Sequence, residues 1–230
     1  MKKKLLILGG SSDIGVELAK KLSKFEEYEL IIHFNKNKNF FEKKYECKFL
    51  KSDLSKLNFK NTLKQFRNDY DIIINLVGYI SNSSFQNFKP IDFQKTIYAN
   101  TLIPLMIIRK SLQNMKKKRF GRIINTSSIG VKFGGGENTF LYSLSKFSNE
   151  FIPSYIKKLA SNNILYNCVR IGVVDTKFHH KIKNKSLKKR ASFIPMKRVA
   201  KKEEIADLMV YLINNNKFIN NEIINITGGE

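Results

Sequence analysis

Tyr142 and Lys146 are the residues of this chain whose types and spacing most directly indicate chemistry. In a helix, a spacing of four residues places a phenol and an ammonium on the same face. The pKa of free tyrosine is about 10, so a phenol that acts as an acid or base at neutral pH needs a nearby positive charge. We therefore expect Lys146 to lower the pKa of Tyr142. The alternative is an ordinary pair on an amphipathic surface helix.

A glycine-rich segment near the N-terminus is typical of a dinucleotide-binding turn. An apolar run at residues 5–8 leads into the sequence GGSSDIG at residues 9–15, and an amphipathic stretch follows. The pattern predicts a strand, a tight turn and a helix, in which Gly9 and Gly15 let the backbone approach a pyrophosphate held by the helix N-terminus. An ordinary strand–turn–helix corner is the alternative. Three side chains of the turn can add hydroxyl donors or cap the helix: Ser11, Ser12 and Asp13.

Together with Ser128, which lies upstream of Tyr142, these segments resemble the short-chain dehydrogenase/reductase family, and the resemblance runs from Lys3 to Gly229. The family's Thr-Gly-x-x-x-Gly-x-Gly loop matches residues 8–15, with Leu8 for the threonine and Asp13 for the middle glycine. The remaining motifs follow in the family's order: Asn-Asn-Ala-Gly at residues 75–78, the helix-four asparagine at Asn100, the serine at Ser128, Tyr-x-x-x-Lys at Tyr142 and Lys146, a Pro-Gly-x-x-x-Thr segment at residues 171–176 without its proline, and a terminal Thr-Gly-Gly at residues 227–229.

This resemblance implies a catalytic set of four residues. Tyr142 would donate the proton and Ser128 would polarise the carbonyl, because a hydride that arrives at a carbonyl carbon leaves charge on the oxygen. Lys146 would lower the pKa of Tyr142 and bind the nicotinamide ribose, and Asn100 would hold a water in a proton relay. Val173 and Thr176 would hold the carboxamide of the cofactor.

The end of the second predicted strand bears on the choice of cofactor. An acid at this place in a dinucleotide fold binds the adenosine ribose and repels a 2′-phosphate. The segment IHFNKNK at residues 32–38 has no acid, and Asn35 and Lys36 could contact a 2′-phosphate, so we expect NADP(H) to be favoured over NAD(H). Asp53 and Leu54 match the family's pair that holds the adenine, although Asp53 could instead cap the next helix. The full predicted cofactor site comprises Gly9, Ser11, Ser12, Asp13, Ile14, Gly15, Asn35, Lys36, Asp53, Leu54, Asn75, Val77, Gly78, Tyr142, Lys146, Val173 and Thr176.

Alternating apolar runs and helical patterns predict an α/β fold, a single Rossmann-type doubly wound parallel sheet of about seven strands flanked by helices. We expect strands near residues 4–9, 29–34, 47–51, 71–76, 121–127, 164–170 and 223–226. We expect helices near residues 13–25, 55–68, 91–116, 141–163 and 202–214, with a short one within 177–191. Pro104 and Pro153 fall inside two of these helices and should kink them. The connection at residues 35–46 is too short for a full helix.

Composition is consistent with one domain over residues 1–230. A chain of 230 residues with 42% hydrophobic residues can bury a full core but has little room for a second domain. The apolar run after the first lysines is too short for a signal peptide, and no segment reaches the length of a membrane span. Cys47 and Cys168 fall in predicted strands, where buried hydrophobes are expected, so a cytoplasmic location follows. No Cys, His and carboxylate cluster has the spacing of a metal site.

The net charge of +23 has two interpretations. Lysine far outnumbers arginine and no nucleic-acid motif is present, so a solvated lysine surface is favoured over nucleic-acid binding. The run from Lys177 to Lys202, however, contains no acid, and in the resembled family this segment folds over the substrate. Such a basic lid would attract an anionic substrate, but compositional bias would give the same run. His179 and His180 lie in it and are expected to be solvated.

The sequence therefore predicts an NAD(P)(H)-dependent oxidoreductase that interconverts a carbonyl and a secondary alcohol. An anionic substrate, either a 3-oxoacyl thioester or an acidic or nucleotide-linked sugar, fits the basic run. Two alternatives stay open: an isomerase or epimerase with the same fold, and a non-catalytic NADPH-binding regulator. Apolar residues on more than one face of the helices at 91–116 and 141–163 predict a homodimer or homotetramer.

Overall fold

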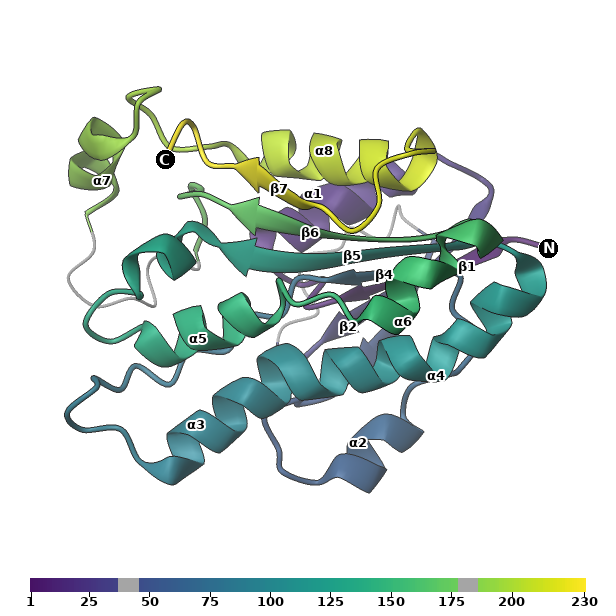
Figure 1. Cartoon of the computed structure of the whole chain (residues 1–230), viewed down its shortest axis with the longest axis horizontal. Helices are drawn as coiled ribbons and strands as arrows, with labels where there is room; N and C mark the ends of the chain where they lie inside the picture. Colours follow the sequence, from purple (N-terminus) through teal and green to yellow (C-terminus); the bar gives the residue numbers. More distant parts are fainter. Residues whose placement is uncertain (37–45, 178–185) are drawn as a thin grey trace.

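A computed structural model describes residues 1–36, 46–177 and 186–230 of the chain, and these form one seven-stranded sheet. The strand order is β3-β2-β1-β4-β5-β6-β7, and every neighbouring pair is parallel (Figure 1). The strands are β1 (Lys3–Leu8), β2 (Tyr28–Phe34), β3 (Cys47–Lys51), β4 (Ile72–Asn75), β5 (Gly121–Ser128), β6 (Ile164–Ile171) and β7 (Ile223–Ile226). The predicted fold class and all seven strand positions are confirmed to within one or two residues at each end.

Helices cover both faces of this sheet. One face carries α1 (Asp13–Leu22) and α8 (Lys202–Asn214), and the other carries the long α4 (Ile103–Lys118) with the segments that follow Tyr142 (Figure 1). The remaining helical elements are α2 (Phe59–Lys64), α3 (Pro90–Ile97), the π-helix η1 (Tyr98–Leu102), the 3₁₀ helix η2 (Ile129–Phe133), α5 (Phe140–Ser148), α6 (Ser154–Lys157), the 3₁₀ helix η3 (Lys158–Asn162) and α7 (Leu187–Phe193).

Side chains of the central strand alternate between two hydrophobic cores. In β1, Leu6 and Leu8 pack on the α4 side, whereas Leu5 and Ile7 pack on the side of α1 and α8. All four are fully buried. A strand covered on both faces must be apolar at every position, which is why the sheet could be recognised as parallel from continuous apolar runs.

Prolines shape the two helices that were predicted to kink. The helix expected over residues 91–116 contains a π-helical turn just before Pro104, which lies in the first turn of α4. The helix expected over residues 141–163 is interrupted, because α5 ends at Ser148 and Pro153 precedes α6. Proline has no amide hydrogen and its ring clashes with the preceding turn, so it starts a helix more readily than it continues one.

The strand order places a crevice between β1 and β4. From β1 the chain runs outward to β2 and β3, and it then returns to β4 on the other side of β1. Connections that leave in opposite directions open a space outside the carboxyl ends of the two strands. The glycine turn after β1 and the segment after β4 therefore face the same space.

Candidate active site

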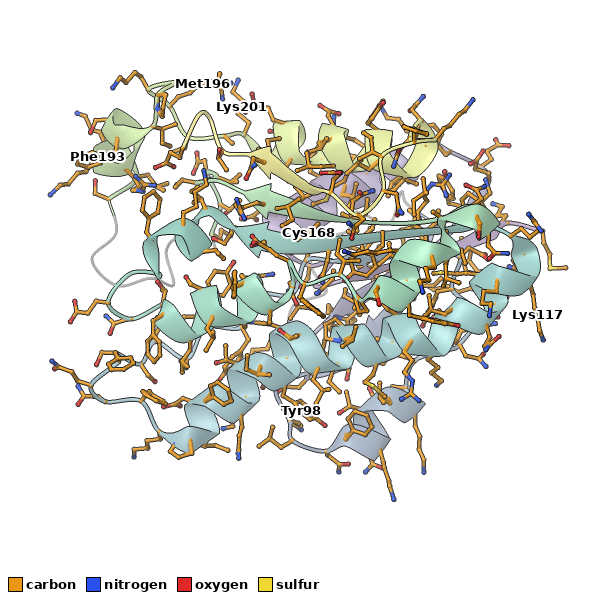
Figure 2. All side chains as sticks on the ribbon, in the orientation of Figure 1. Tyr98, Lys117, Cys168, Phe193, Met196 and Lys201 are labelled. Atoms are coloured by element: carbon orange, nitrogen blue, oxygen red, sulfur yellow. The ribbon has the colours of Figure 1, made fainter. Side chains whose placement is uncertain are left out.

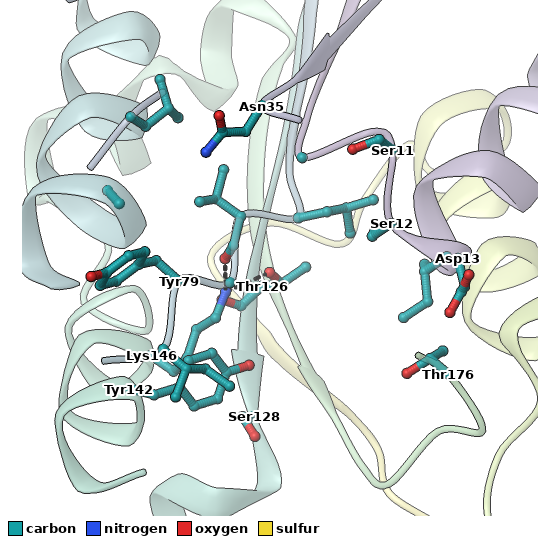
Figure 3. A pocket seen from close by; sticks show the side chains of 18 of the residues that line it. Ser11, Ser12, Asp13, Asn35, Tyr79, Thr126, Ser128, Tyr142, Lys146 and Thr176 are labelled. Atoms are coloured by element: carbon teal, nitrogen blue, oxygen red, sulfur yellow. Dashed lines mark hydrogen bonds between the residues drawn. The ribbon is translucent and has the colours of Figure 1, made fainter. Parts of the chain in front are cut away.

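A cavity of about 770 Å³ lies at the carboxyl ends of the strands. It is lined by the turn after β1, the ends of β2 to β6 and one face of α5, and Figure 3 shows how their side chains converge. The volume is within the range of small-molecule and cofactor sites. Fifteen of the predicted site residues line it: Gly9, Ser11, Ser12, Asp13, Ile14, Asn35, Lys36, Asp53, Leu54, Val77, Gly78, Ser128, Tyr142, Lys146 and Thr176.

The glycine turn forms a narrow cradle at one side of this cavity. Gly9 has a φ of +69°, and a Cβ there would lie 3.0 Å from the carbonyl of Leu76. A Cβ on Gly15 would lie 2.5 Å from the carbonyl oxygen of Gly10, so this glycine packs the helix against the turn and does not line the cavity. Both positions require glycine, and the amino end of α1 is left facing the cavity, as a pyrophosphate site requires.

Ser12, and not Asp13, caps α1. The hydroxyl oxygen of Ser12 accepts a hydrogen bond from the amide of Gly15 at 3.2 Å. Asp13 is the first residue of the helix, and its carboxylate accepts the amide of Lys177 at 2.6 Å. The suggestion that Asp13 caps the helix is therefore wrong. Its side chain instead connects the glycine turn to the segment after β6, next to Thr176 in Figure 3.

Tyr142, Ser128 and Lys146 meet at the opposite side of the cavity (Figure 3). Tyr142 and Lys146 lie on one face of α5, and Ser128 ends β5. Ser128 lies near Tyr142 in the cavity, and its side chain partly opposes the rise in the Tyr142 pKa. The Lys146 ammonium is buried and donates to Val77 O at 2.8 Å, Thr126 O at 3.1 Å and Thr126 Oγ1 at 3.0 Å. The expected pairing of residue types on one helical face is thus present.

Burial controls the protonation of both groups. It raises the pKa of Tyr142 above its ordinary value, and the Ser128 side chain opposes this shift in part. Burial also lowers the pKa of Lys146 to about 8. The Lys146 Nζ lies 5.8 Å from the centre of the Tyr142 ring, and its three hydrogen bonds go to Val77 and Thr126. Desolvation of the phenolate therefore dominates the pKa of Tyr142, and the lowering effect of Lys146 stays a prediction.

Asn100 lies behind the cavity and does not line it. Its side chain accepts from Tyr79 N at 2.7 Å and donates to Tyr79 O at 3.0 Å and to Ser145 Oγ at 2.9 Å. It thereby ties the segment after β4 to α5. The predicted role of Asn100 in a water relay stays a prediction.

Pro104 explains why the carbonyl of Asn100 is available to other partners. In a regular helix this oxygen would accept the amide of residue 104, which proline lacks. It instead accepts the side-chain amides of Asn75 at 3.3 Å and Asn149 at 3.2 Å. Asn75 also donates to Asn125 Oδ1 and accepts from Val77 N. Asn75 thus lies outside the predicted contact with cofactor and fixes the loop that carries Val77 and Gly78.

The far end of the cavity contains the residues expected to bind adenosine. Asn35 and Lys36 line it beyond β2, and Asp53 and Leu54 line it beyond β3. The Asp53 carboxylate accepts from Ser55 N at 3.0 Å and from Ser55 Oγ at 2.7 Å. Asn58 caps the next helix, so the alternative role of Asp53 as that cap is wrong.

The segment after β6 leaves the sheet and returns to it. Val173 O accepts the amide of Ala200, and Asp175 donates its amide to Ala200 O, so the segment before the basic run is paired with a residue near the end of the run. The Val173 side chain packs with Ile129 and Ile194 and does not line the cavity, whereas Thr176 does. Of the basic run, residues 178–185, with His179 and His180, lie outside the described residues, as does most of the short connection at residues 35–46.

Two arginines of the basic run have acidic partners. Arg190 of α7 pairs with Glu230, and Arg198 binds Glu204 through both guanidinium nitrogens at 2.8 and 2.6 Å. Neither acid belongs to the run, so the number of basic residues in the run is larger than the number of its unpaired positive charges. Figure 2 shows Phe193 and Met196, which lie between these two arginines in the sequence, on the side of the molecule away from Lys117.

Several polar residues that line the cavity were missed by the sequence reasoning, among them His33, Thr126, Ser127 and Tyr79. Thr126 receives the Lys146 ammonium and passes a hydrogen bond to Asn75 O at 2.6 Å. For His33, Thr126 and Ser127, a polar residue within a strand is the signal that could have revealed them, because buried polar groups need partners.

No helix in the described ranges is both long and apolar enough to cross a membrane. Within the same residues, no group of three or more His, Cys, Asp and Glu side chains could hold a metal ion.

Comparison with known proteins finds this arrangement among oxidoreductases. A family model described as "Enoyl-(Acyl carrier protein) reductase" matches residues 11–230. The 3-oxoacyl-[acyl-carrier-protein] reductase FabG of Aquifex aeolicus is 27% identical over 97% of this chain and 95% of its own length. The corresponding enzyme of Buchnera aphidicola from Acyrthosiphon pisum is 30% identical over 71% of this chain and 67% of its own length. The crystal structure of YwfH, described as an NADPH-dependent reductase involved in bacilysin biosynthesis, superimposes with a TM-score of 0.82 at 26% identity, covering 100% of this chain and 98% of that one.

Proposed function

Because the chain belongs to the short-chain dehydrogenase/reductase family of NAD(P)-dependent oxidoreductases, we propose that it reduces a carbonyl compound to a secondary alcohol, reversibly in principle. The observation that carries this proposal is the meeting of Tyr142, Ser128 and Lys146 in one cavity with the glycine turn. The cradle of Gly9 and the amino end of α1 fit a dinucleotide. A bound nicotinamide would supply the hydride.

The protein residues supply the proton and the polarisation. The Ser128 hydroxyl donates a hydrogen bond to the carbonyl oxygen, and the Tyr142 phenol donates a proton to the same oxygen as negative charge develops on it. The raised pKa of Tyr142 keeps the phenol protonated at neutral pH, so its ground state is the acid that a reduction needs. Lys146 binds the nicotinamide ribose, and its ammonium places a positive charge near the carbonyl that is reduced.

The reaction can be tested with NADPH that carries deuterium at C4. We expect label on the carbinol carbon of at least one product from a panel of ketones, 3-oxoacyl thioesters and acidic sugars, with an enoyl thioester as a comparison. An epimerase would convert a substrate without net oxidation of NADPH. Binding of NADPH without transfer to any carbonyl would contradict the proposal and favour a regulator.

We further propose that NADPH is the preferred cofactor. Asn35 and Lys36 line the adenosine end of the cavity, and no carboxylate follows β2 there to repel a 2′-phosphate. The similar structure of YwfH is described as NADPH-dependent, which supports this choice. The dissociation constant of NADPH should be at least about tenfold below that of NADH, a difference of about 1.4 kcal/mol, and titration of both cofactors into the enzyme measures it.

An anionic substrate is the finer part of the proposal, and the exposed lysines of α7 carry it. Lys188 and Lys189 are exposed, whereas Arg190 is paired with Glu230. Replacing Lys188 and Lys189 by Glu should lower kcat/KM for an acidic substrate by about tenfold at low salt, since the charges act on encounter. The kcat at saturation should change less, and the dependence of kcat/KM on ionic strength should become flatter.

A matched control for the α7 lysines is the pair Lys20 and Lys24, which are exposed at the end of α1 away from the cavity. Their replacement by Glu changes the net charge equally and should leave the salt dependence near that of the parent. If both double variants behave alike, the lysines reflect composition and a neutral ketone or aldehyde becomes the better substrate.

We also propose that a second copy of the chain covers the exposed apolar face formed by α5 and the η1–α4 helix. The exposed residues of this face are Leu102, Leu105, Leu144, Phe147 and Phe151, and the last two have 60% and 77% of their surface accessible. α4 and α5 lie on the same side of the sheet (Figure 1), and a patch of this kind on a two-fold axis is self-complementary. A cytoplasmic location, and one domain spanning residues 1–230, stay predictions.

Light scattering at micromolar concentration should therefore show a dimer or a tetramer. Replacing Phe147 and Phe151 by Glu should shift the population toward monomer, because burial of two carboxylates in the interface is costly. Phe218→Glu, at a fully exposed phenylalanine after α8, is the control and should keep the assembly. A monomeric parent protein would refute this proposal.

A further inference from the structure

His33 is a buried polar residue next to the cofactor cavity. It lies one residue before the end of β2, is 3% exposed, and is flanked by Ile32 and Phe34. Its ring also lies 5.7 Å from that of Phe66, centre to centre. An imidazole in such surroundings is stable only when both nitrogens have hydrogen-bond partners.

Both ring nitrogens have such partners, and together they define the tautomer. The Nε2 atom lies 2.9 Å from Ser52 O, which can only accept, so Nε2 carries the hydrogen. The Nδ1 atom therefore has a free lone pair, and it accepts the amide of Gly9 at 3.1 Å. Burial lowers the pKa of His33 to about 4, so the ring is neutral at working pH and Nδ1 stays an acceptor.

These two hydrogen bonds join the ends of three adjacent strands. Gly9 begins the glycine turn after β1, and Ser52 precedes Asp53 after β3, with His33 on β2 between them. Main-chain hydrogen bonds run in parallel, from Gly10 N to His33 O at 2.9 Å and from Ser52 N to Phe34 O at 3.0 Å. The imidazole thus holds the glycine turn after β1 and the segment after β3 in a fixed position relative to each other.

We propose that His33 is a positioning residue for the cofactor, because it holds the glycine turn and the Ser52–Asp53 segment at the spacing that the adenosine half requires. This inference rests on the proposed function. Gly9 has the greatest need of such support, since its positive φ and its missing side chain leave its conformation weakly determined. The predicted effect is on cofactor affinity, and the hydride step should be affected little.

Three variants separate the two contacts. In His33→Asn the amide oxygen takes the place of Nδ1 and can accept from Gly9, while in His33→Gln the amide nitrogen takes the place of Nε2 and can donate to Ser52. His33→Leu removes both contacts. We expect the dissociation constant of NADPH to rise about tenfold in His33→Leu, which corresponds to about 1.4 kcal/mol, and to rise less in His33→Asn and His33→Gln. Fluorescence titration of NADPH measures it without turnover.

Two further measurements on the protein without cofactor test the geometry. In the parent, the ¹⁵N spectrum of the imidazole should show a protonated Nε2 and an unprotonated Nδ1. Hydrogen exchange of the Gly9 amide should be at least about tenfold faster in His33→Leu than in His33→Asn, because only the latter retains an acceptor. Should His33→Leu fail to fold, the comparison of His33→Asn with His33→Gln decides, since only the former protects Gly9.

Equal NADPH affinity in all three variants, or an affinity of His33→Leu within twofold of the parent, would overturn the inference. Equal affinities would mean that the two hydrogen bonds of the imidazole do not contribute to NADPH binding. A parent protein that does not bind NADPH would instead contradict the proposed function, so the two failures are distinguishable.

Discussion

The variant Tyr142→Phe is expected to lose about 10²- to 10⁴-fold in the rate of carbonyl reduction while its affinity for NADPH changes less than about twofold. Only the oxygen that donates the proton is removed, and the ring keeps its place on α5 beside Ser128. The rate should be measured as NADPH oxidation under single-turnover conditions, so that product release does not hide the chemical step. A variant that turns over within tenfold of the parent would exclude Tyr142 as the proton donor.

Tyr79 offers a matched control for this experiment. It is a second phenol in the same cavity, and Figure 3 shows its hydroxyl pointing away from Ser128 and Lys146. Tyr79→Phe removes the same atom from the same cavity at a position where no proton transfer is assigned. Its turnover should stay within about tenfold of the parent.

The variant Lys146→Met should lose both turnover and cofactor affinity, and its stability should respond differently to pH. The folded-state pKa of Lys146 is lowered from 10.5 to about 8. Between these values the unfolded chain keeps the proton that the folded protein releases, so the free energy of unfolding rises with pH in this window. Lys146→Met lacks this contribution, which for a group buried this fully is on the order of 3 kcal/mol.

Guanidinium unfolding of the parent and of Lys146→Met at about pH 7.5 and pH 10 tests the sign of this effect. The difference between the two proteins isolates Lys146 from the many other groups that titrate in this range. Lys157→Met removes an exposed lysine and should follow the parent at both pH values. A parent that gains no stability relative to Lys146→Met would show that Lys146 is charged at little cost.

The sheet could be predicted from sequence because its central strands are covered on both faces. Continuous apolar runs such as residues 5–8 and 72–74 carry that signal without any knowledge of their neighbours. Helix interruptions were harder to place. Proline marked both of them, but whether the chain kinks or leaves the helix depends on packing around Asn149 and Pro153, which no local pattern contains.

Site residues were predictable as members of ordered motifs, but their contacts were not. The motif of Tyr142 and Lys146 gave the correct helical face, yet the sequence could not show that Lys146 is surrounded by the carbonyl oxygens of Val77 and Thr126. His33 was visible as one polar residue in an apolar run. Its structural role depends on contacts with the segments after β1 and β3, which lie next to it only in the folded sheet.

The strand order also has a consequence for synthesis of this protein on the ribosome. The central strand β1 is paired on one side by β2, which follows it closely, and on the other by β4. After β4 emerges, its outer edge has no partner until the whole of α3, η1 and α4 has been made and β5 follows. An unpaired edge of this kind is a site of aggregation, so the nascent chain has to be protected during that interval. Because the cavity also needs Thr176 and Lys177, cofactor cannot assist folding before most of the chain has been translated.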